Sequence, residues 1–259
     1  MDLYLKDKVI VVTGGSSGIG KGICMALVQE CAIPFIIGRN KDRIDSFIAE
    51  IEANGGKAGR AYAELTDPTQ CENAIKIAIT EFGKIDGLIN NAGINDSVGL
   101  EHGTYEAFIE SLHKNVIHYY HLAKLVLPEL KKNKGAIVNI GSKTSITGQG
   151  GTSGYAAANG ARNALTREWA VELLPYSIRV NAVIVAECYT PLYKKWINTF
   201  DNPETKLADI SKNIPLENRM TTEQEIADTV LFLMSSRSSH TTGQLLFVDG
   251  GYTHLDRSI

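Results

Sequence analysis

A short apolar run at residues 9–12 leads directly into a glycine-rich segment at residues 13–20. Every member of the run is β-branched, which favours a strand that is buried on both faces. After the glycines, Ile23, Ala26 and Leu27 recur at the spacing of one helix face. The segment therefore predicts a strand, a tight turn and a helix in immediate succession, and this succession constrains the fold more than any other feature.

The same alternation of apolar runs and helical stripes continues along the chain. Further strands are predicted near 32–37, 58–63, 88–89, 136–140, 178–184 and 245–248, with helices near 41–53, 68–82, 104–132 (interrupted), 155–174 and 223–235. Hydrophobic strands that alternate with helices indicate a parallel sheet covered on both faces. We expect one doubly wound α/β domain of about seven strands over residues 1–259, with residues 187–220 as a substrate lid.

Composition excludes several classes of protein. The chain has 259 residues, a net charge of −3 and no basic run, which argues against nucleic-acid binding. No apolar stretch approaches the ~20 residues that span a bilayer, and no signal peptide is recognised, so we expect a cytoplasmic protein without membrane contact. The four cysteines, at positions 24, 31, 71 and 188, show no CxxC spacing, so no metal site is expected.

The glycines between the first strand and the first helix are typical of a turn that binds phosphate. Glycine permits a tight turn and lets a pyrophosphate approach the backbone, while the helix N-terminus offers free N–H groups. Serine hydroxyls can add further donors. We therefore expect a dinucleotide on a Rossmann-type fold, contacted by Gly14, Ser16, Ser17, Gly18, Ile19 and Gly20.

Several motifs, in order along nearly the whole chain, resemble those of the short-chain dehydrogenase/reductase family. They are the glycine turn, Asn91-Ala92-Gly93 after the fourth strand, Asn115, Ser142 with Tyr155 thirteen residues later, Thr190, and residues 248–251. The resemblance implies an NAD(P)-dependent oxidoreductase that acts on a small molecule. It also implies a homotetramer, with the helices near 104–130 and 155–174 at the interface.

The resemblance assigns a role to each of these residues. Tyr155 would accept the proton of an alcohol, and Ser142 would hold the substrate oxygen. Asn115 would take part in structure and proton relay. The segment of Asn91, Ala92 and Gly93 would flank the adenosine ribose, and Thr190 would bind the nicotinamide amide.

Asn159 departs from the family pattern, which has a lysine four residues after the tyrosine. A tyrosine phenol has a reference pKa of ~10, and the lysine's charge favours phenolate and holds the nicotinamide ribose. Asparagine can bind a ribose hydroxyl but brings no charge. The enzyme would then work at higher pH, or another cation such as Lys143 would substitute, or the chain is a weakly active cofactor-binding protein or an altered variant. We expect Asn159→Lys to raise activity near neutral pH.

The choice of cofactor depends on the residues that follow the second strand. NAD enzymes usually carry a carboxylate there for the ribose 2′-hydroxyl, whereas this chain has Gly38 and then Arg39. A guanidinium can pair with a 2′-phosphate, so NADP is favoured over NAD. Glu64 and Leu65, after the third strand, are expected near the adenine.

The substrate side chains should come from loops at the carboxyl ends of the strands. Amides, charged groups and aromatics suit the hydroxyls and the ring face of a sugar. The predicted substrate residues are Asn95, Lys143, Gln149, Glu187 and Trp196. Within the family, segments such as 117–120, 165–170 and 249–257 look closest to bacterial L-fucose dehydrogenase-like members, which implies oxidation of a sugar at C1. Another carbonyl or acyl-carrier-protein ketoreductase is the alternative.

Overall fold

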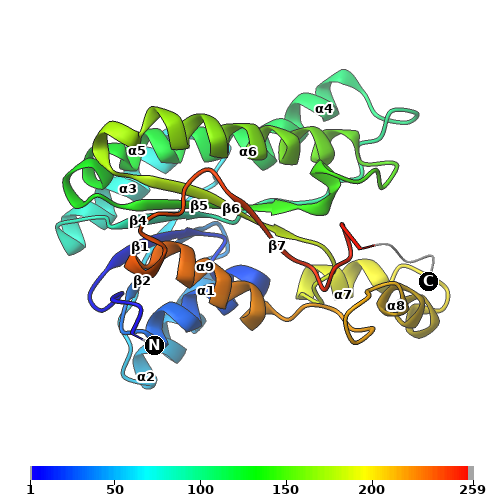
Figure 1. The fold of residues 1–259 in the computed structure, drawn as a ribbon, viewed down its shortest axis with the longest axis horizontal. Coiled ribbons are helices and arrows are strands. Elements are labelled where there is room, and N and C mark those ends of the chain that lie inside the picture. The colour runs from blue at the N-terminus through cyan, green and yellow to red at the C-terminus, as the bar shows by residue number, and fades with distance from the viewer. Residues whose placement is uncertain (1, 256–259) are drawn as a thin grey trace.

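Seven parallel strands form one sheet in the computed structural model, which describes residues 2–255. The sheet has the order β3-β2-β1-β4-β5-β6-β7 (Figure 1). Its strands are β1 (Val9–Thr13), β2 (Ile33–Gly38), β3 (Gly59–Tyr62), β4 (Gly87–Asn90), β5 (Ala136–Ser142), β6 (Arg179–Val185) and β7 (Leu245–Val248). The predicted doubly wound α/β sheet is confirmed. Asp256 and Arg257, at the end of the segment 249–257 that suggested the subgroup, lie outside the described residues.

Helices cover both faces of this sheet. They are α1 (Gly18–Gln29), α2 (Lys41–Ala53), α3 (Pro68–Phe82), α4 (Tyr105–Leu112), α5 (His118–Asn133), α6 (Ser153–Glu172), α7 (Pro191–Ile197), α8 (Pro203–Lys212) and α9 (Glu223–Met234). In Figure 1, α1, α2 and α9 lie on one side of the sheet and α3, α5 and α6 on the other. No helix of the described part of the chain is both long and apolar enough to cross a membrane.

The alternation of side chains along a strand explains why the continuous apolar runs need both layers. Ile10 and Val12 of β1 belong to the core beneath α1, α2 and α9, whereas Val11 belongs to the core beneath α3, α5 and α6. All three side chains are at most 1% exposed. A strand with polar residues at alternate positions could not occupy this place.

The order of the strands reverses at β1. The chain runs from β1 outward to β3 and then returns to place β4 against the other side of β1. A crevice opens at the carboxyl ends of the strands at such a point, and ligands of open α/β sheets bind there. The turn after Thr13 and the segment after Asn90 meet at this position.

The interrupted helix expected near 104–132 consists of α4, a π-helical segment at His113–Ile117, and α5. The wider segment carries Asn115, which is fully buried. Its amide Nδ2 donates to Ser111 O at 3.0 Å, and its Oδ1 accepts from Ile94 N at 2.7 Å. Asn115 therefore connects the interruption to the loop after β4. A π-helical turn of this kind often marks a functional site.

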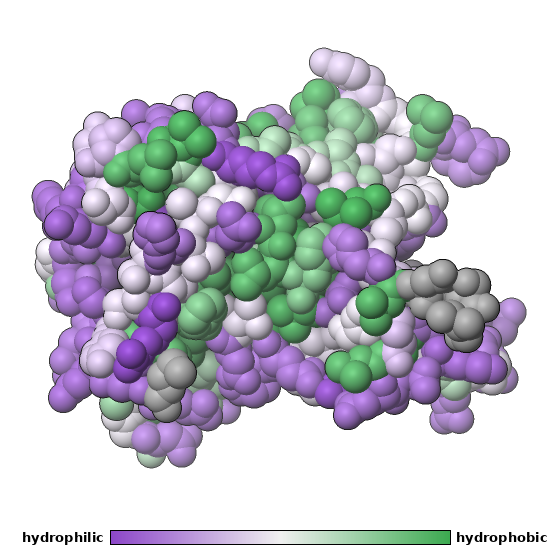
Figure 2. All heavy atoms as spheres, in the orientation of Figure 1, coloured by the Kyte–Doolittle hydropathy of each residue, from purple (hydrophilic) through white to green (hydrophobic). Residues whose placement is uncertain are grey.

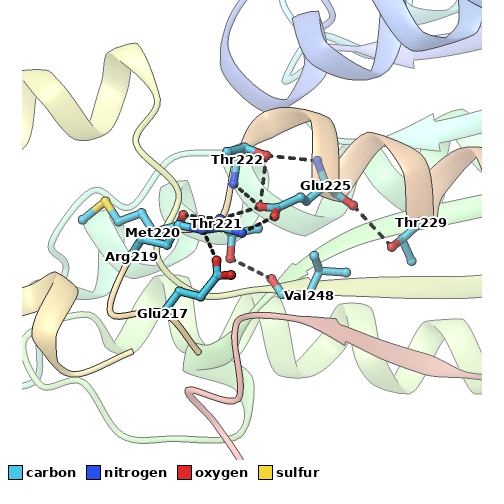
Figure 3. A network of polar contacts seen from close by, with 8 residues as sticks. All are labelled: Glu217, Arg219, Met220, Thr221, Thr222, Glu225, Thr229 and Val248. Carbon is cyan, nitrogen blue, oxygen red and sulfur yellow. Dashed lines mark hydrogen bonds and ion pairs between the residues drawn. The ribbon is translucent and has the colours of Figure 1, made fainter. Parts of the chain in front are cut away.

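Residues 187–220 contain α7 and α8, which the sequence analysis did not predict. The end of this segment is attached to the rest of the chain by a polar network (Figure 3). Arg219 pairs with Glu217 and Glu225, and Thr222 forms a capping box with Glu225 at the start of α9. Thr221 N donates to Glu187 O at 3.0 Å, so both ends of the segment meet at this point.

Candidate active site

One cavity of about 1200 Å³ lies at the carboxyl ends of the strands. Among the residues predicted to form the site, those that line it are Gly14, Ser17, Gly18, Ile19, Gly20, Arg39, Glu64, Leu65, Asn91, Ala92, Gly93, Ser142, Tyr155 and Thr190. Those that do not line it are Ser16, Asn95, Asn115, Lys143, Gln149, Asn159, Glu187 and Trp196. The cavity thus joins the predicted phosphate turn to the predicted serine and tyrosine.

The glycine turn has a shape that only glycine permits. Gly18 has a φ of +54°, in the left-handed region that side chains avoid. A Cβ at Gly20 would lie 2.4 Å from Gly14 O, a backbone atom that cannot move without deforming the turn. Ser17 begins α1 in an extended conformation, and its side chain does not cap the helix. The first N–H groups of α1 and this hydroxyl are therefore suited to a pyrophosphate.

Asn91 holds this turn against β4. Its backbone N donates to Thr13 Oγ1 at 2.9 Å, and its Nδ2 donates to Thr13 O at the same distance. Ala92 N also donates to Thr13 Oγ1, at 3.0 Å. These bonds connect the ends of β1 and β4, where the strand order reverses.

Arg39 and Glu64 face each other at the rim of the cavity. Arg39 Nη1 lies 3.2 Å from Glu64 Oε2, and the two side chains are 78% and 41% exposed. An exposed pair of this kind contributes at most about 1 kcal/mol to stability, so a ligand can compete for the guanidinium.

Ser142 and Tyr155 bring hydroxyl groups to the same cavity. Ser142 ends β5, and its Oγ accepts hydrogen bonds from Thr144 N at 3.3 Å and Thr144 Oγ1 at 3.1 Å. It therefore caps the following turn in addition to facing the cavity. Tyr155 lies in the first turn of α6 and is half-buried.

Asn159 lies behind the cavity wall, where it is fully buried. Its Nδ2 donates to Tyr155 O at 2.9 Å, and its Oδ1 accepts from Arg162 Nη1 at 3.0 Å. Both polar ends of the amide are thus bound within the protein. Asn159 does not line the cavity in this conformation, and its assignment to the cofactor stays a prediction.

Arg162 was not singled out from the sequence, although it lines the same cavity as Tyr155. Its residue is 3% exposed, and it lies on the same face of α6 as the buried Ala158 and Thr166. A charged residue at an otherwise buried position of a helix was the available signal, because isolated charges are rarely buried without a reason.

His118 is a second residue that the sequence analysis missed. It lines the cavity, and burial, followed by the charge of Arg162, lowers its pKa to about 3, so the ring is neutral at ordinary pH. Its Nε2 lies 3.0 Å from Lys114 O, and its Nδ1 has no hydrogen-bond partner within residues 2–255. This leaves a buried acceptor at the cavity wall.

Lys143 and Glu187, two predicted substrate residues, form an ion pair with each other. The lysine ammonium also lies 3.9 Å from the centroid of the Tyr252 ring. Glu187 also acts on a nearby phenol: burial, followed by the negative charge of Glu187, raises the pKa of Tyr193 well above its usual range. A carboxylate therefore balances the charge of Lys143 in this structure, and its suggested substitution for the lysine that Asn159 replaces stays a prediction.

The other three predicted substrate residues lie near the surface. Asn95 and Gln149 are exposed, and Trp196 is 41% exposed. The Trp196 ring packs edge-on between Tyr193 and Phe200, with centroids 5.1 Å apart in both cases. Their role in substrate binding stays a prediction. Within residues 2–255 no group of three or more metal-ligating side chains is found.

Comparison with known proteins gives consistent results. The family model described as short chain dehydrogenase matches residues 8–200. The chain is 34% identical to the 3-oxoacyl-[acyl-carrier-protein] reductase FabG of Thermotoga maritima over 96% of this chain and 99% of the relative. It is 32% identical to the L-fucose dehydrogenase of Rattus norvegicus over 94% of this chain and 88% of the relative.

A solved structure described as Cj0485 dehydrogenase superposes with a TM-score of 0.94. That protein is 43% identical, and the match covers 100% of this chain and 99% of that one. The seven-stranded parallel sheet agrees with this structural likeness. The chain belongs to the short-chain dehydrogenase/reductase family of oxidoreductases.

Proposed function

We propose that this chain oxidises a sugar such as L-fucose at C1, with NADP as the favoured hydride acceptor. The observation that carries the proposal is one continuous cavity that holds Gly18 and Gly20 at one part and Ser142 and Tyr155 at another. A nucleotide bound along the turn and a substrate bound at the hydroxyls would meet inside it. The likeness to an L-fucose dehydrogenase supports a sugar as substrate.

The chemistry needs few groups from the protein. A bound nicotinamide supplies the acceptor for the hydride that leaves C1. Tyr155, as phenolate, takes the proton of the C1 hydroxyl, and the ring then carries a C=O bond as a lactone. Ser142 donates a hydrogen bond to the same oxygen and holds it in place for this transfer.

Arg39 supports the preference for NADP. Its guanidinium lines the cavity and is 78% exposed, so it is free to turn toward a 2′-phosphate. Glu64 opposes this preference, because it pairs with Arg39 and would repel the phosphate. To bind the 2′-phosphate of NADP, Arg39 would therefore exchange its ion pair with Glu64 for one with the phosphate.

Two of the proposed substrate residues require a movement of the lid at residues 187–220. Glu187 and Trp196 belong to this segment but do not line the cavity, so a sugar would contact them only after the segment moves. Asn95, Lys143 and Gln149 do not line the cavity either and lie outside this segment. We also propose a homotetramer. Two observations support the homotetramer. The edge strand β7 carries four apolar side chains that are only partly buried. Apolar surface also crosses the face of the molecule that Figure 2 shows.

Reduction of a β-ketoacyl thioester is the second candidate, favoured by the comparable identity to an acyl-carrier-protein reductase. A weakly active cofactor-binding protein is the third, because Asn159 replaces the expected lysine. The test is incubation of the purified protein with NADP or NAD and a panel of aldoses and alcohols. Reduced cofactor with a β-ketoacyl thioester forms the reverse assay.

Absorbance of the reduced nicotinamide, followed across pH, separates the three functions. Turnover of L-fucose or a related aldose supports the first, and turnover of the thioester alone supports the second. Nucleotide binding by calorimetry without turnover of any compound supports the third. Absence of binding to either nucleotide would contradict all three.

A further inference from the structure

Arg162 holds a buried positive charge that no carboxylate neutralises. Its residue is 3% exposed, and no aspartate or glutamate within residues 2–255 forms an ion pair with it. Buried charges are normally paired, because the cost of desolvation is several kcal/mol per ion. A charge that stays unpaired at a cavity wall acts on whatever group occupies that cavity.

Neutral oxygens hold the guanidinium in place. Arg162 Nε donates to Asn115 O at 2.7 Å, and Nη2 donates to the same carbonyl. Nη1 donates to Ile140 O and to Asn159 Oδ1, each at 3.0 Å. The ring of Tyr119 lies against the guanidinium, with Cζ 4.2 Å from the ring centroid. These contacts fix the cation but leave its charge intact.

The cation reaches back along α6 to the side chain of Asn159. Arg162 follows Tyr155 by about two helical turns, and helical side chains lean toward the N-terminus of their helix. Its Nη1 contacts the side chain of Asn159, where the family's lysine would begin. Arg162 and Tyr155 line the cavity, whereas Asn159 does not. A buried cation therefore contacts position 159 and lines the same cavity as Tyr155, although Asn159 itself is neutral.

Gly93 provides the room for this arrangement. A Cβ at Gly93 would lie 2.7 Å from Arg162 Nη2 and 2.9 Å from Asn115 Oδ1. Any larger residue there would push the guanidinium away from the cavity wall. The loop after β4 thus accommodates the charge as well as the nucleotide.

We propose that Arg162 supplies the positive charge that favours the phenolate of Tyr155, in place of the lysine that Asn159 replaces. The inference rests on the oxidoreductase activity proposed above. Arginine keeps its proton at every accessible pH, so Arg162 acts by its field alone and carries no proton. Arg162 is a positioning residue, and the phenol proton of Tyr155 is released to solvent.

Few other charges act on this part of the cavity. On α5, His118 is neutral because burial lowers its pKa to about 3, and Tyr119 is neutral because burial raises its pKa to about 12. Asp96, in the loop after β4, accepts from Ser111 Oγ at 2.9 Å. Four charged groups of other elements form two ion pairs: Lys114 with Glu110, and Lys143 with Glu187. Arg162 is thus a buried charge in contact with Asn159 that forms no ion pair within residues 2–255.

The pH profile of kcat tests this role. Arg162→Met should move the profile at least one unit to higher pH, which lowers kcat at neutral pH about tenfold or more, with little change in KM for the nucleotide. Arg162→Lys should restore the profile because it restores the charge. A wild-type profile in Arg162→Met, or an equal loss of kcat at every pH, would overturn the proposal.

Arg179 offers a matched control. It is a partly buried arginine whose Nη1 donates to Leu233 O and to Ser238 Oγ, each at 2.6 Å, away from the cavity. Arg179→Met should lower stability without moving the pH profile. Where Arg162→Met does not fold, Arg162→Gln replaces it, because its amide can still donate to Asn115 O while it carries no charge.

A second measurement is independent of turnover. The near-ultraviolet difference absorbance of tyrosinate, with Tyr155→Phe subtracted, follows the ionisation of Tyr155 in the cofactor-free protein. Arg162→Met should move its midpoint at least one unit to higher pH, and an unmoved midpoint contradicts the proposal. If the wild type binds nucleotide but oxidises no substrate, the proposed function fails while this titration still decides the role of Arg162.

Discussion

The ammonium of Lys143 pairs with the carboxylate of Glu187, and these side chains are only 11% and 12% exposed. Removing one partner by Lys143→Met or Glu187→Gln should cost about 3 kcal/mol, because the other charge stays buried without compensation. The double variant should cost less than the sum of the two. Urea denaturation of the four proteins measures the coupling, and additive losses would show that the pair is not energetically coupled.

The glycine turn should tolerate no side chain at Gly20. Gly20→Ala places a Cβ 2.4 Å from Gly14 O, so the turn must deform and calorimetry should detect at least a tenfold loss of NADP affinity. Gly148→Ala is the control, because a Cβ there meets nothing within 4 Å. Equal affinities of the two variants would mean that the turn does not bind the nucleotide.

Arg39 and Glu64 should have opposite effects on the choice of nucleotide. Arg39→Asp should weaken NADP binding about tenfold or more, because a charged hydrogen bond is worth about 1.5–3 kcal/mol. Glu64→Gln should strengthen it, since the guanidinium loses its competing partner. The ratio of KM for NADP to KM for NAD is the measurement. An unchanged ratio in Arg39→Asp would remove this residue from cofactor selection.

His118 should make the protein sensitive to acid. Burial lowers its pKa from an ordinary value near 6.5 to about 3, so below pH 6.5 the unfolded chain binds a proton that the folded protein does not. The contribution of His118 to stability is therefore lost as pH falls from 6.5 toward 3. Between pH 7 and pH 5.5 the loss should be about 1 kcal/mol.

His118→Gln should abolish this part of the pH dependence, since its amide can still donate to Lys114 O without titrating. Free energies of unfolding at the two pH values, from urea denaturation, provide the comparison. The side chain of His102 is 86% exposed and its Nε2 lies 3.7 Å from Glu101 Oε1, so His102→Gln gives the control variant. The same slope in His118→Gln and the wild type would contradict the assignment.

The strands and most helices were predictable because their signals are local. The apolar runs at β1 and β6 are continuous, and a central strand in a parallel sheet requires that continuity. Helices α7 and α8 were missed because the segment of residues 187–220 is rich in aromatic and polar residues and lacks a long apolar stripe. Both start at a proline after a capping residue, Thr190 and Asn202, which was the available signal.

The sequence by itself determined the order of the seven strands and of the helices other than α7 and α8, the glycine turn, and the spacing of Ser142 and Tyr155. These follow from side-chain periodicity and backbone freedom over a few residues. Only the tertiary structure decided that Lys143 pairs with Glu187, and that Arg162 is the cation in contact with Asn159. The acceptors of Arg162 include carbonyls of Asn115 and Ile140, residues that come together only when α6 packs on the sheet, so no local pattern could reveal them.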